Sequence, residues 1–408
     1  MKRRVAFFFV LALTMMFSLS FFDSNSFAKP HKVKLSKKTV YSVYNGGKLD
    51  MVSTKGLSRD TMVNWTVEDS SIACIVTGSL GGGNLYYTSL SLPAYQTCYI
   101  NPKLPGTTRL IAKADGHKKA ICKIIVAEKG DAIGYYVETS RNRFGIDDEE
   151  KQAADLIRSV IPQIVTEDMS RVERIRAVND YISQITTYDM ENFKAKIYVP
   201  SNATVSGPML YHKAVCAGYA VTFDTFMYAL GIPCRYIYGT SLPQKEGDEG
   251  GAHGWNLVQM DDDAWYHIDV TWNDDDLDSY NNNGVCYKYF LLTDSAICST
   301  RTWDASLFPA CVGTEYSDYR SVLNKEAVVR NLPGYVVFDS KQEAMDYLIM
   351  QGKAGVEHVP IAYRGDSWIS ESERNYIKDA VDRKIWFWWD SSGVCMGEYR
   401  WYNYTLYY

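Results

Sequence analysis

Residues 215–272 constrain the fold of this chain most, because their pattern requires one buried helix followed by two strands. Apolar side chains recur at helical spacing after Cys216, which predicts a helix over residues 216–230. Gly231 stands where a left-handed residue commonly ends a helix, and Pro233 follows it. The pattern therefore places Cys216 at the N-terminus of a buried helix.

Two runs typical of β-strands follow the helix, at residues 254–259 and 265–271. The acidic turn at residues 261–263 separates them, so the two runs predict an antiparallel pair. His253 lies at the start of the first run and Asp269 lies within the second. Pairing of the strands would bring the imidazole and the carboxylate together.

Cysteine, histidine and aspartate in these settings suit nucleophilic catalysis. A thiol at a helix N-terminus faces unpaired N–H groups and the positive end of the helix dipole, which favour the thiolate. We expect Cys216 to be the nucleophile, His253 the general base, and Asp269 the group that orients the imidazole. The backbone N–H of Cys216 is expected to supply part of an oxyanion hole, whose second donor the sequence does not identify.

A metal site is the main alternative to catalysis for the same region of the sequence. His267 and Asp269 are two positions apart on an expected strand, so they face the same way, and His253 could complete a zinc site. Metal sites usually contain a second closely spaced ligand pair, which is not evident here. The acidic run at residues 274–278 lacks the ligand spacing of a calcium loop and is expected to be a solvated turn. The sequence therefore predicts no metal and no other cofactor.

Three motifs follow one another in the order cysteine, histidine, aspartate: VCAGY at 215–219, HGWN at 253–256 and WYHIDVTW at 265–272. With their flanking segments they resemble the bacterial secreted branch of the transglutaminase-like superfamily over residues 132–312. The resemblance implies a papain-like α+β domain with a triad of Cys216, His253 and Asp269. It does not fix the reaction, because the superfamily includes cross-linking acyltransferases, peptidases, amidases and inactive scaffolds.

The N-terminus has the pattern of a secretory signal peptide. Basic residues at positions 2–4 precede an apolar run at residues 5–22, and a small-x-small site ends at Ala28. We expect residues 1–28 to be removed near Ala28, with an uncleaved anchor as the alternative, and the mature protein to be secreted or held at the cell surface. The chain has a formal net charge of -5 and no basic patch, so no nucleic-acid partner and no further membrane span are expected.

Residues 31–127 alternate between apolar and polar positions in short runs separated by glycine-containing turns. This pattern predicts an all-β immunoglobulin-like sandwich. Residues 64–73 and 105–108 resemble the bacterial immunoglobulin-like group 2 domain, which implies adhesion to a cell-surface glycan or protein. A spacer that holds the enzyme away from the cell surface is the alternative.

Helices and strands are also expected on both sides of the central motifs. Residues 149–161 and 171–185 have helical periodicity, and residues 194–213 have no clear period and are expected to form a loop beside the nucleophile. Residues 330–408 alternate between strand and helix patterns, which predicts a small C-terminal α/β domain. Its alternating aromatic residues favour core and cross-strand packing over a sugar-stacking face.

All nine cysteines lie after the expected signal peptide. An odd number leaves at least one thiol unpaired within a monomer, which agrees with a free Cys216. The only pairing that we expect is between Cys298 and Cys311.

The sequence as a whole predicts an exported cysteine enzyme that acts on an acyl or amide bond of a protein or a cell-wall peptide. Hydrolysis is slightly favoured over transamidation, because the polar loop at residues 244–251 suggests an open, hydrated cleft. The alternative from another class is a cell-surface binding module with a vestigial triad.

Overall fold

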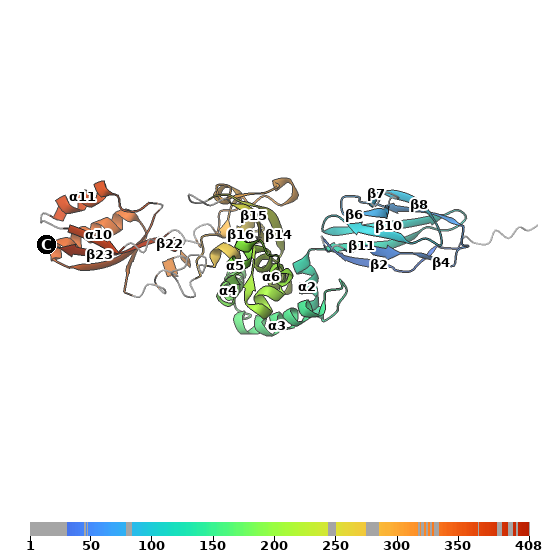
Figure 1. The fold of residues 1–408 in the computed structure, drawn as a ribbon, viewed down its shortest axis with the longest axis horizontal. Helices are drawn as coiled ribbons and strands as arrows, with labels where there is room; N and C mark the ends of the chain where they lie inside the picture. Colours follow the sequence, from blue (N-terminus) through green and yellow to red (C-terminus); the bar gives the residue numbers. More distant parts are fainter. Residues whose placement is uncertain are drawn as a thin grey trace, which may run out of the picture. The chain divides into compact units, whose positions relative to one another are not determined.

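The computed structural model describes residues 31–407 except for positions 45, 47, 79–83, 244–249, 275–284, 317, 318, 320, 321, 324, 327, 328, 330–333, 366, 382–385, 391–394, 397 and 398. The expected signal peptide at residues 1–28 and most of the polar loop before His253 lie outside the described residues. The chain divides into two compact units, residues 1–126 and 127–408 (Figure 1). Among the described residues, every helix is too short or too polar to span a lipid bilayer.

The first unit is β-rich, as expected, and contains two larger sheets that share one core. The first sheet has the order β2 (Thr39–Val43), β11 (Ala120–Ala127), β10 (Gly106–Ala114), β5 (Met62–Val67) and β8 (Ser89–Pro93). The second has the order β3 (Asp50–Val52), β9 (Cys98–Pro102), β6 (Ala73–Gly78) and β7 (Asn84–Tyr87), and β1 (Lys34–Leu35) pairs with β4 (Thr54–Lys55).

Alternation of buried and exposed residues explains how the two sheets of the first unit pack. In β10 every second side chain is buried, including Leu110 and Ala112, because successive residues of a strand face opposite sides. These side chains join Trp65 from the first sheet and Ile75 and Ile100 from the second in one hydrophobic cluster. The assignment of this region to the immunoglobulin-like group stays a prediction.

The second unit is organised around α6 (Cys216–Ala229), which is buried on most sides (Figure 1). This helix packs against β15 (Gly251–Gln259) of a sheet with the order β17 (Phe290–Leu292), β16 (Trp265–Ile268), β15, β14 (Cys234–Ser241) and β18 (Arg301–Thr302). The helices α2 (Lys129–Thr139), α3 (Asp148–Ile164) and α4 (Arg171–Ile185) complete the layer, and α2 and α4 contact α6. A helix that is hydrophobic all round must be buried, which places α6 in the core.

The helix α2 was not expected from the sequence, because two glycines lower its intrinsic helix propensity. Gly130 and Gly134 permit close packing against α6 instead. A Cβ atom at Gly134 would lie 2.6 Å from the Cβ of Tyr228. The glycines therefore serve the contact between the two helices.

The bounds of α3 and α4 agree closely with the expected helices, and both begin with capping boxes, at Asp147 with Glu150 and at Ser170 with Glu173. Residues 194–213, expected to be a loop, contain short helical turns instead. The longer stretch of residues 187–214 contains β12 (Thr187–Tyr188), α5 (Met190–Ala195), η1 (Pro200–Ala203), η2 (Gly207–Tyr211) and β13 (Lys213–Ala214).

The second expected strand of the central motifs is shorter than predicted. It ends at Ile268, and α7 (Val270–Asn273) begins immediately after Asp269. The reason is that the Asp269 carboxylate accepts the backbone N–H of Trp272 and caps this helical turn. Two further short helices, α8 (Asp294–Ile297) and η4 (Ala305–Leu307), follow in the chain.

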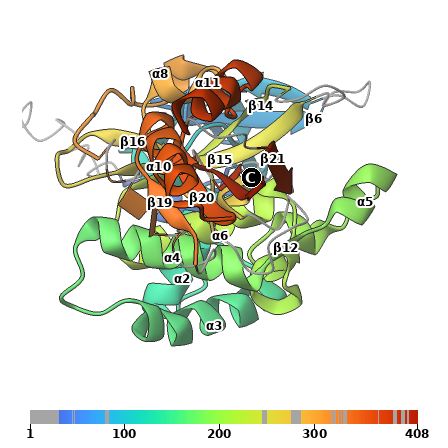
Figure 2. The ribbon, with the colours of Figure 1, turned by 90° about the vertical axis from the view of Figure 1, so that its left-hand side faces the viewer.

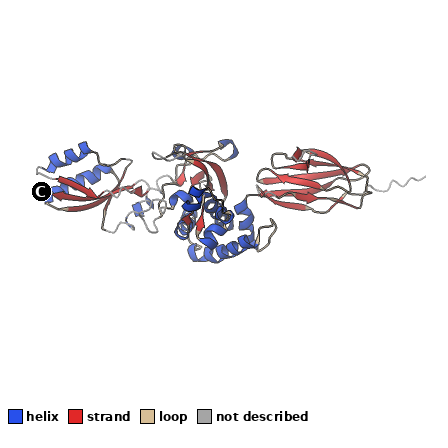
Figure 3. Ribbon diagram, viewed as in Figure 1, coloured by secondary structure: helices blue, strands red, loops and turns tan. Residues whose placement is uncertain are grey.

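The C-terminal part of the second unit has the expected order of strands and helices (Figure 3). Its sheet has the order β19 (Val336–Phe338), β20 (His358–Arg364), β23 (Tyr399–Tyr407) and β21 (Trp386–Asp390), and β22 (Cys395–Met396) pairs with β23. The helices α10 (Lys341–Ala354) and α11 (Glu371–Val381) contribute to its core, which contains Tyr402 and Tyr404. Buried tyrosines agree with the expected core packing, while the domain bounds 132–312 and 330–408 stay predictions.

The expected pairing of Cys298 with Cys311 is wrong, because both thiols are free. Cys298 is exposed at the end of α8 and its sulfur lies near the carbonyl of Ser295, whereas Cys311 is buried. Its sulfur lies 3.9 Å from the carbonyl of Pro309.

Substitution of Gly134 by Ala tests the close packing of α2 on α6. We expect the free energy of unfolding to fall by about 1–3 kcal/mol, because the added methyl group overpacks the contact with Tyr228 despite the better helix propensity of alanine. Urea denaturation measures the change. Gly365→Ala is the matched control, because its added Cβ would meet the nearest atom at 3.4 Å. Equal stability of the two variants would contradict the packing role.

Candidate active site

Cys216 is the first residue of α6, as the sequence predicted, and among the described residues no side chain caps this helix end. Burial opposes ionisation of the thiol. The pKa of Cys216 is nevertheless lowered, because a hydrogen bond and the charge of His253 and a hydrogen bond from the backbone N–H of Gly254 stabilise the thiolate. These contacts therefore make Cys216 easier to ionise than an ordinary cysteine.

His253 and Asp269 come together through the register of β15 and β16. Asn256 lies opposite Ile268 in this antiparallel pair, so His253 and Asp269 are diagonal neighbours on one face. The Nε2 atom of His253 lies 2.7 Å from Oδ2 of Asp269, and both side chains are buried. Since Asp269 engages Nε2, Nδ1 is the ring nitrogen that remains for Cys216.

The electrostatics of His253 favour an imidazolium ion beside the thiolate. Burial alone would lower the pKa of His253. The charge and hydrogen bond of Asp269, together with the hydrogen bond to Cys216, raise this pKa to about 9. The structure thus brings the three predicted residues into one continuous set of contacts in which Cys216 tends to lose its proton and His253 tends to keep one.

Arg301 is also part of the site, which was not expected from the sequence. Its Nη2 atom lies 2.7 Å from Oδ2 of Asp269 and its Nε atom lies 3.3 Å away. The guanidinium carbon lies 4.7 Å from the ring centre of Trp272 and 4.6 Å from that of Tyr289. Burial opposes ionisation of Asp269, but the charges of His253 and Arg301 hold its pKa below the usual value.

No local sequence pattern marks Arg301, because it comes from β18, far along the chain from the three motifs. Its side chain is completely buried, and its Nη1 atom donates to the carbonyl of Thr300. A buried arginine of this kind fixes both the charge and the position of Asp269.

Tyr188 lies on the other side of the nucleophile. The strand β12 pairs in parallel with β13, which brings Tyr188 opposite Ala214 and close to Cys216. The backbone N–H of Cys216 donates to the Tyr188 hydroxyl, and burial raises the pKa of Tyr188 well above its ordinary value. The expected oxyanion donor therefore already has a neutral hydroxyl as its partner.

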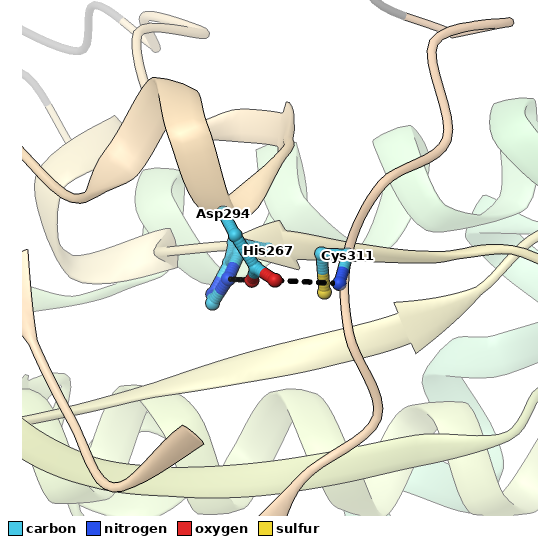
Figure 4. A group of neighbouring side chains, drawn as sticks. All are labelled: His267, Asp294 and Cys311. Carbon is cyan, nitrogen blue, oxygen red and sulfur yellow. Dashed lines mark hydrogen bonds and ion pairs between the residues drawn. The ribbon is translucent and has the colours of Figure 1, made fainter. Parts of the chain in front are cut away.

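His267 does not join His253 and Asp269, which argues against the alternative metal site. It lies beside Asp294 and Cys311, and the three groups offer ligand atoms within 4.8 Å of one another (Figure 4). Trp255 donates its indole N–H to Nδ1 of His267 at 2.9 Å, and Nε2 lies 2.8 Å from Oδ1 of Asp294. An indole N–H only donates, so Nδ1 of His267 accepts. Nε2 therefore carries the proton and donates a hydrogen bond to the Asp294 carboxylate. A neutral ring with this arrangement has no lone pair left for a metal ion.

The hydrogen bonds of His267 hold Trp255 in place, and Trp255 in turn packs against His253. Burial lowers the pKa of His267, which keeps the ring neutral and able to accept from Trp255. The Trp255 indole stacks on the His253 ring with 5.8 Å between centres and 17° between planes. His267 thereby fixes the aromatic surface against which His253 lies.

Residues 158–270, which include Cys216, His253 and Asp269, match the model of the transglutaminase-like superfamily. This chain carries a transglutaminase-like domain. Such a domain supports a cysteine-dependent enzyme in general terms. No curated protein matches the chain.

Three solved structures show weak similarity to this chain. A crystal structure of a TGase is 22% identical with a TM-score of 0.27, covering 40% of this chain and 43% of its own. A candidate cysteine protease from Cytophaga hutchinsonii is 11% identical with a TM-score of 0.22, covering 60% and 73%. The ASH/PapD-like domain 7 of human CEP192 is 12% identical with a TM-score of 0.15, covering 24% and 87%. The chain thus matches less than half the length of the TGase.

Replacement of Arg301 by Gln tests its role in holding Asp269. We expect the free energy of unfolding at pH 7 to fall by about 3–5 kcal/mol, because the buried carboxylate loses a partner. The pKa of Asp269 is lowered in the folded state, so the stability that it contributes exists above its unfolded pKa and disappears as the pH falls through the folded pKa. The difference between variant and wild type should therefore shrink in acid.

Thermal unfolding between pH 3 and pH 8 measures this difference. Lys151→Gln is the control, because it breaks an exposed ion pair with Asp148 in the same unit and should leave the midpoint nearly unchanged. If the Arg301 variant were as stable as the Lys151 variant at pH 7, the proposed role of Arg301 would be wrong.

Proposed function

We propose that this protein is an exported cysteine enzyme that acts on an acyl or amide carbonyl of a protein or a cell-wall peptide. The observation that supports the proposal is the paired tendency of Cys216 to be a thiolate and of His253 to be an imidazolium ion, with Asp269 bonded to the far nitrogen. Cysteine nucleophiles require this arrangement of thiolate, proton carrier and orienting acid.

The first half of the proposed reaction forms an acyl-enzyme. The Sγ atom of Cys216 attacks the carbonyl carbon and forms a C–S bond, while the carbonyl π electrons move to oxygen. That oxygen takes the place of the Tyr188 hydroxyl at the N–H of Cys216. The oxyanion then re-forms the carbonyl, the C–N bond breaks, and His253 gives its proton to the departing amine.

The second half releases the acyl group. Water or a primary amine attacks the thioester carbonyl and gives a proton to His253, and the C–S bond breaks to restore the thiolate. Asp269 stays ionised throughout, because Arg301 and the backbone N–H of Trp272 hold its charge. Water yields a carboxylic acid and an amine yields a new amide.

We favour hydrolysis slightly over transamidation. This preference rests on the polar composition of residues 244–251, of which residues 244–249 lie outside the described part of the chain. An open and hydrated loop beside His253 would admit water to the thioester, whereas transfer to an amine requires shielding from water.

The proposal includes location and partners. We propose export through the signal peptide at residues 1–28, with cleavage near Ala28. The β-rich first unit would bind a cell-surface glycan or protein, or act as a spacer. No nucleic acid, metal or other cofactor takes part in the proposed reaction.

Replacement of Cys216 by Ala tests the reaction. Wild-type protein is incubated with glutamine-bearing peptides and an excess of a primary amine, and the products are weighed by mass spectrometry. We expect deamidated or cleaved peptide from the wild type and a loss of at least about a thousandfold in turnover from the variant, because the nucleophile is gone. Predominant amine adducts would reject hydrolysis in favour of transamidation. Unchanged turnover by the variant would reject Cys216 as the nucleophile.

The rate of Cys216 alkylation and the pH dependence of peptide turnover provide separate tests of the ion pair. Because the pKa of Cys216 is lowered, its reaction with iodoacetamide should already be fast at pH 7, and His253→Gln should slow it by about tenfold or more. Peptide turnover should fall above about pH 9, where His253 loses the proton that the departing amine needs.

The labelled residue is identified by peptide mapping, and the exposed Cys298 in the same molecule serves as the internal control. A Cys216 that reacts no faster than Cys298 at pH 7 and turns over no peptide would favour the binding module with a vestigial triad.

A further inference from the structure

Four large apolar side chains are exposed within a short segment that follows Tyr188. We name residues 190–198 the apolar ledge. The exposed fractions are 37% for Met190, 56% for Phe193, 57% for Ile197 and 77% for Tyr198. The helix α5, which forms the first part of the ledge, buries none of its residues. Grouped exposed apolar residues on a soluble protein commonly mark a binding surface.

The apolar ledge is held in place at both ends by one buried carboxylate. Asp189 is completely buried and caps α5 by accepting the backbone N–H of Asn192. Its Oδ2 atom accepts hydrogen bonds from the side chains of Asn192 at 2.7 Å and Asn202 at 2.5 Å. Lys213 completes the contacts with its Nζ atom at 3.3 Å. A surface whose two ends are fixed in this way is preorganised, so binding to it orders few additional groups.

The ledge begins beside the nucleophile. The ring of Phe193 lies 5.8 Å from that of Tyr188, in an edge-to-face contact. The Tyr188 hydroxyl accepts the backbone N–H of Cys216. At the other end of the segment, the carbonyl of Asn202 accepts the backbone N–H of Val215 at 3.0 Å. Figure 2 shows α5 projecting from the edge of the neighbouring helices.

We propose that the apolar ledge binds an aromatic or large aliphatic side chain of a polypeptide substrate, next to the residue whose carbonyl Cys216 attacks. This inference rests on the proposed function. An extended peptide advances about 3.3 Å per residue, so a side chain one or two positions from the attacked carbonyl reaches across the Tyr188 ring to Phe193. The substrate class is therefore a polypeptide with an apolar residue flanking the reacting one.

The charges and the size of the ledge favour a peptide over other apolar partners. The ledge contains the acidic Glu191 as well as the basic Lys194 and Lys196, so it lacks the uniformly basic face that attracts anionic lipid surfaces. A stable interface between two protein subunits buries about 800 Å² on each partner and uses about 20–30 residues a side, whereas the ledge offers four exposed apolar side chains. A single substrate side chain matches the extent of the surface.

The test uses the full-length protein with two substitutions in the ledge, Phe193→Ser and Tyr198→Ser. The control is Tyr376→Ser, which removes a similarly exposed ring from α11. Two glutamine-bearing peptides are compared that differ only in having Phe or Ser beside the glutamine. Wild type and control should prefer the Phe peptide by about tenfold in kcat/KM, and the double variant should lose this preference through KM. The rate of Cys216 alkylation by iodoacetamide should be the same in all three proteins, because a small reagent does not need the ledge.

A preference for the Phe peptide that survives in the double variant would overturn the proposal, as would equal turnover of both peptides by the wild type. Ledge-dependent self-association in sedimentation would also overturn it, because a second copy of the chain would then be the occupant.

Direct binding separates this inference from the proposed function. Fluorescein-labelled Phe and Ser peptides are titrated against Cys216→Ala protein with and without the ledge substitutions. Ledge-dependent binding of the Phe peptide supports the ledge even if the wild type turns over neither peptide, in which case only the proposed reaction fails. Equal binding of both peptides, or no binding of either, rejects the ledge whatever the wild type turns over.

Discussion

A single buried negative charge, on Asp269, determines the arrangement of the candidate site. A carboxylate without access to water is costly unless other groups balance its charge and fill its hydrogen bonds. Arg301 and His253 supply the opposite charges and the N–H of Trp272 occupies the second oxygen. The position of His253, and through it the ionisation of Cys216, depends on these bonds. The aromatic rings around Arg301 are consequently part of the support for the nucleophile.

A second group of carboxyl groups, largely buried between α2 and α6 and the start of β14, shows pKa shifts in the opposite direction. Burial raises the pKa of Glu128 to about 7 and that of Asp131 to about 6, and it raises the pKa of Asp224 well above its ordinary value. The Cys234 thiol donates a hydrogen bond to the Asp224 carboxylate, and this bond opposes the effect of burial only in part. These carboxyl groups therefore take up a proton at a higher pH than an exposed carboxyl group does. Asp224 and Asp269, both fully or almost fully buried, thus have pKa values that shift in opposite directions.

Much of the site could be predicted from the sequence because its signals are local. The position of Cys216 at a helix N-terminus could be predicted from the apolar periodicity of residues 216–230 and from Gly231. Gly231 has a φ of 69° and is the left-handed residue that follows the end of α6. The proximity of His253 and Asp269 followed from the pairing of two adjacent strands. Capping residues also placed α4 correctly, with Ser170 and Glu173 at its start.

The rest depends on contacts between distant parts of the chain. Arg301 reaches Asp269 from a two-residue strand whose sequence resembles any edge strand. The helix α2 has two glycines that suit its packing on α6 and conceal its helical character. The function of Asp269 as a helix cap was also hidden, because the preceding residues continue to look like a strand. In each case tertiary contacts outweigh local propensity.

The bond between Asp189 and Asn202 closes the base of the segment that carries the ledge. The chain leaves the neighbourhood of Cys216 at Asp189 and returns to it at Asn202, and between these two points the ring of Phe193 contacts that of Tyr188. A segment that is closed at its base in this way tolerates changes in its length, since loop-closure entropy rises only slowly with length. Under the proposed function, substrate preference would therefore depend on residues 190–198 and the reaction on Cys216, His253 and Asp269, so each could diverge without the other.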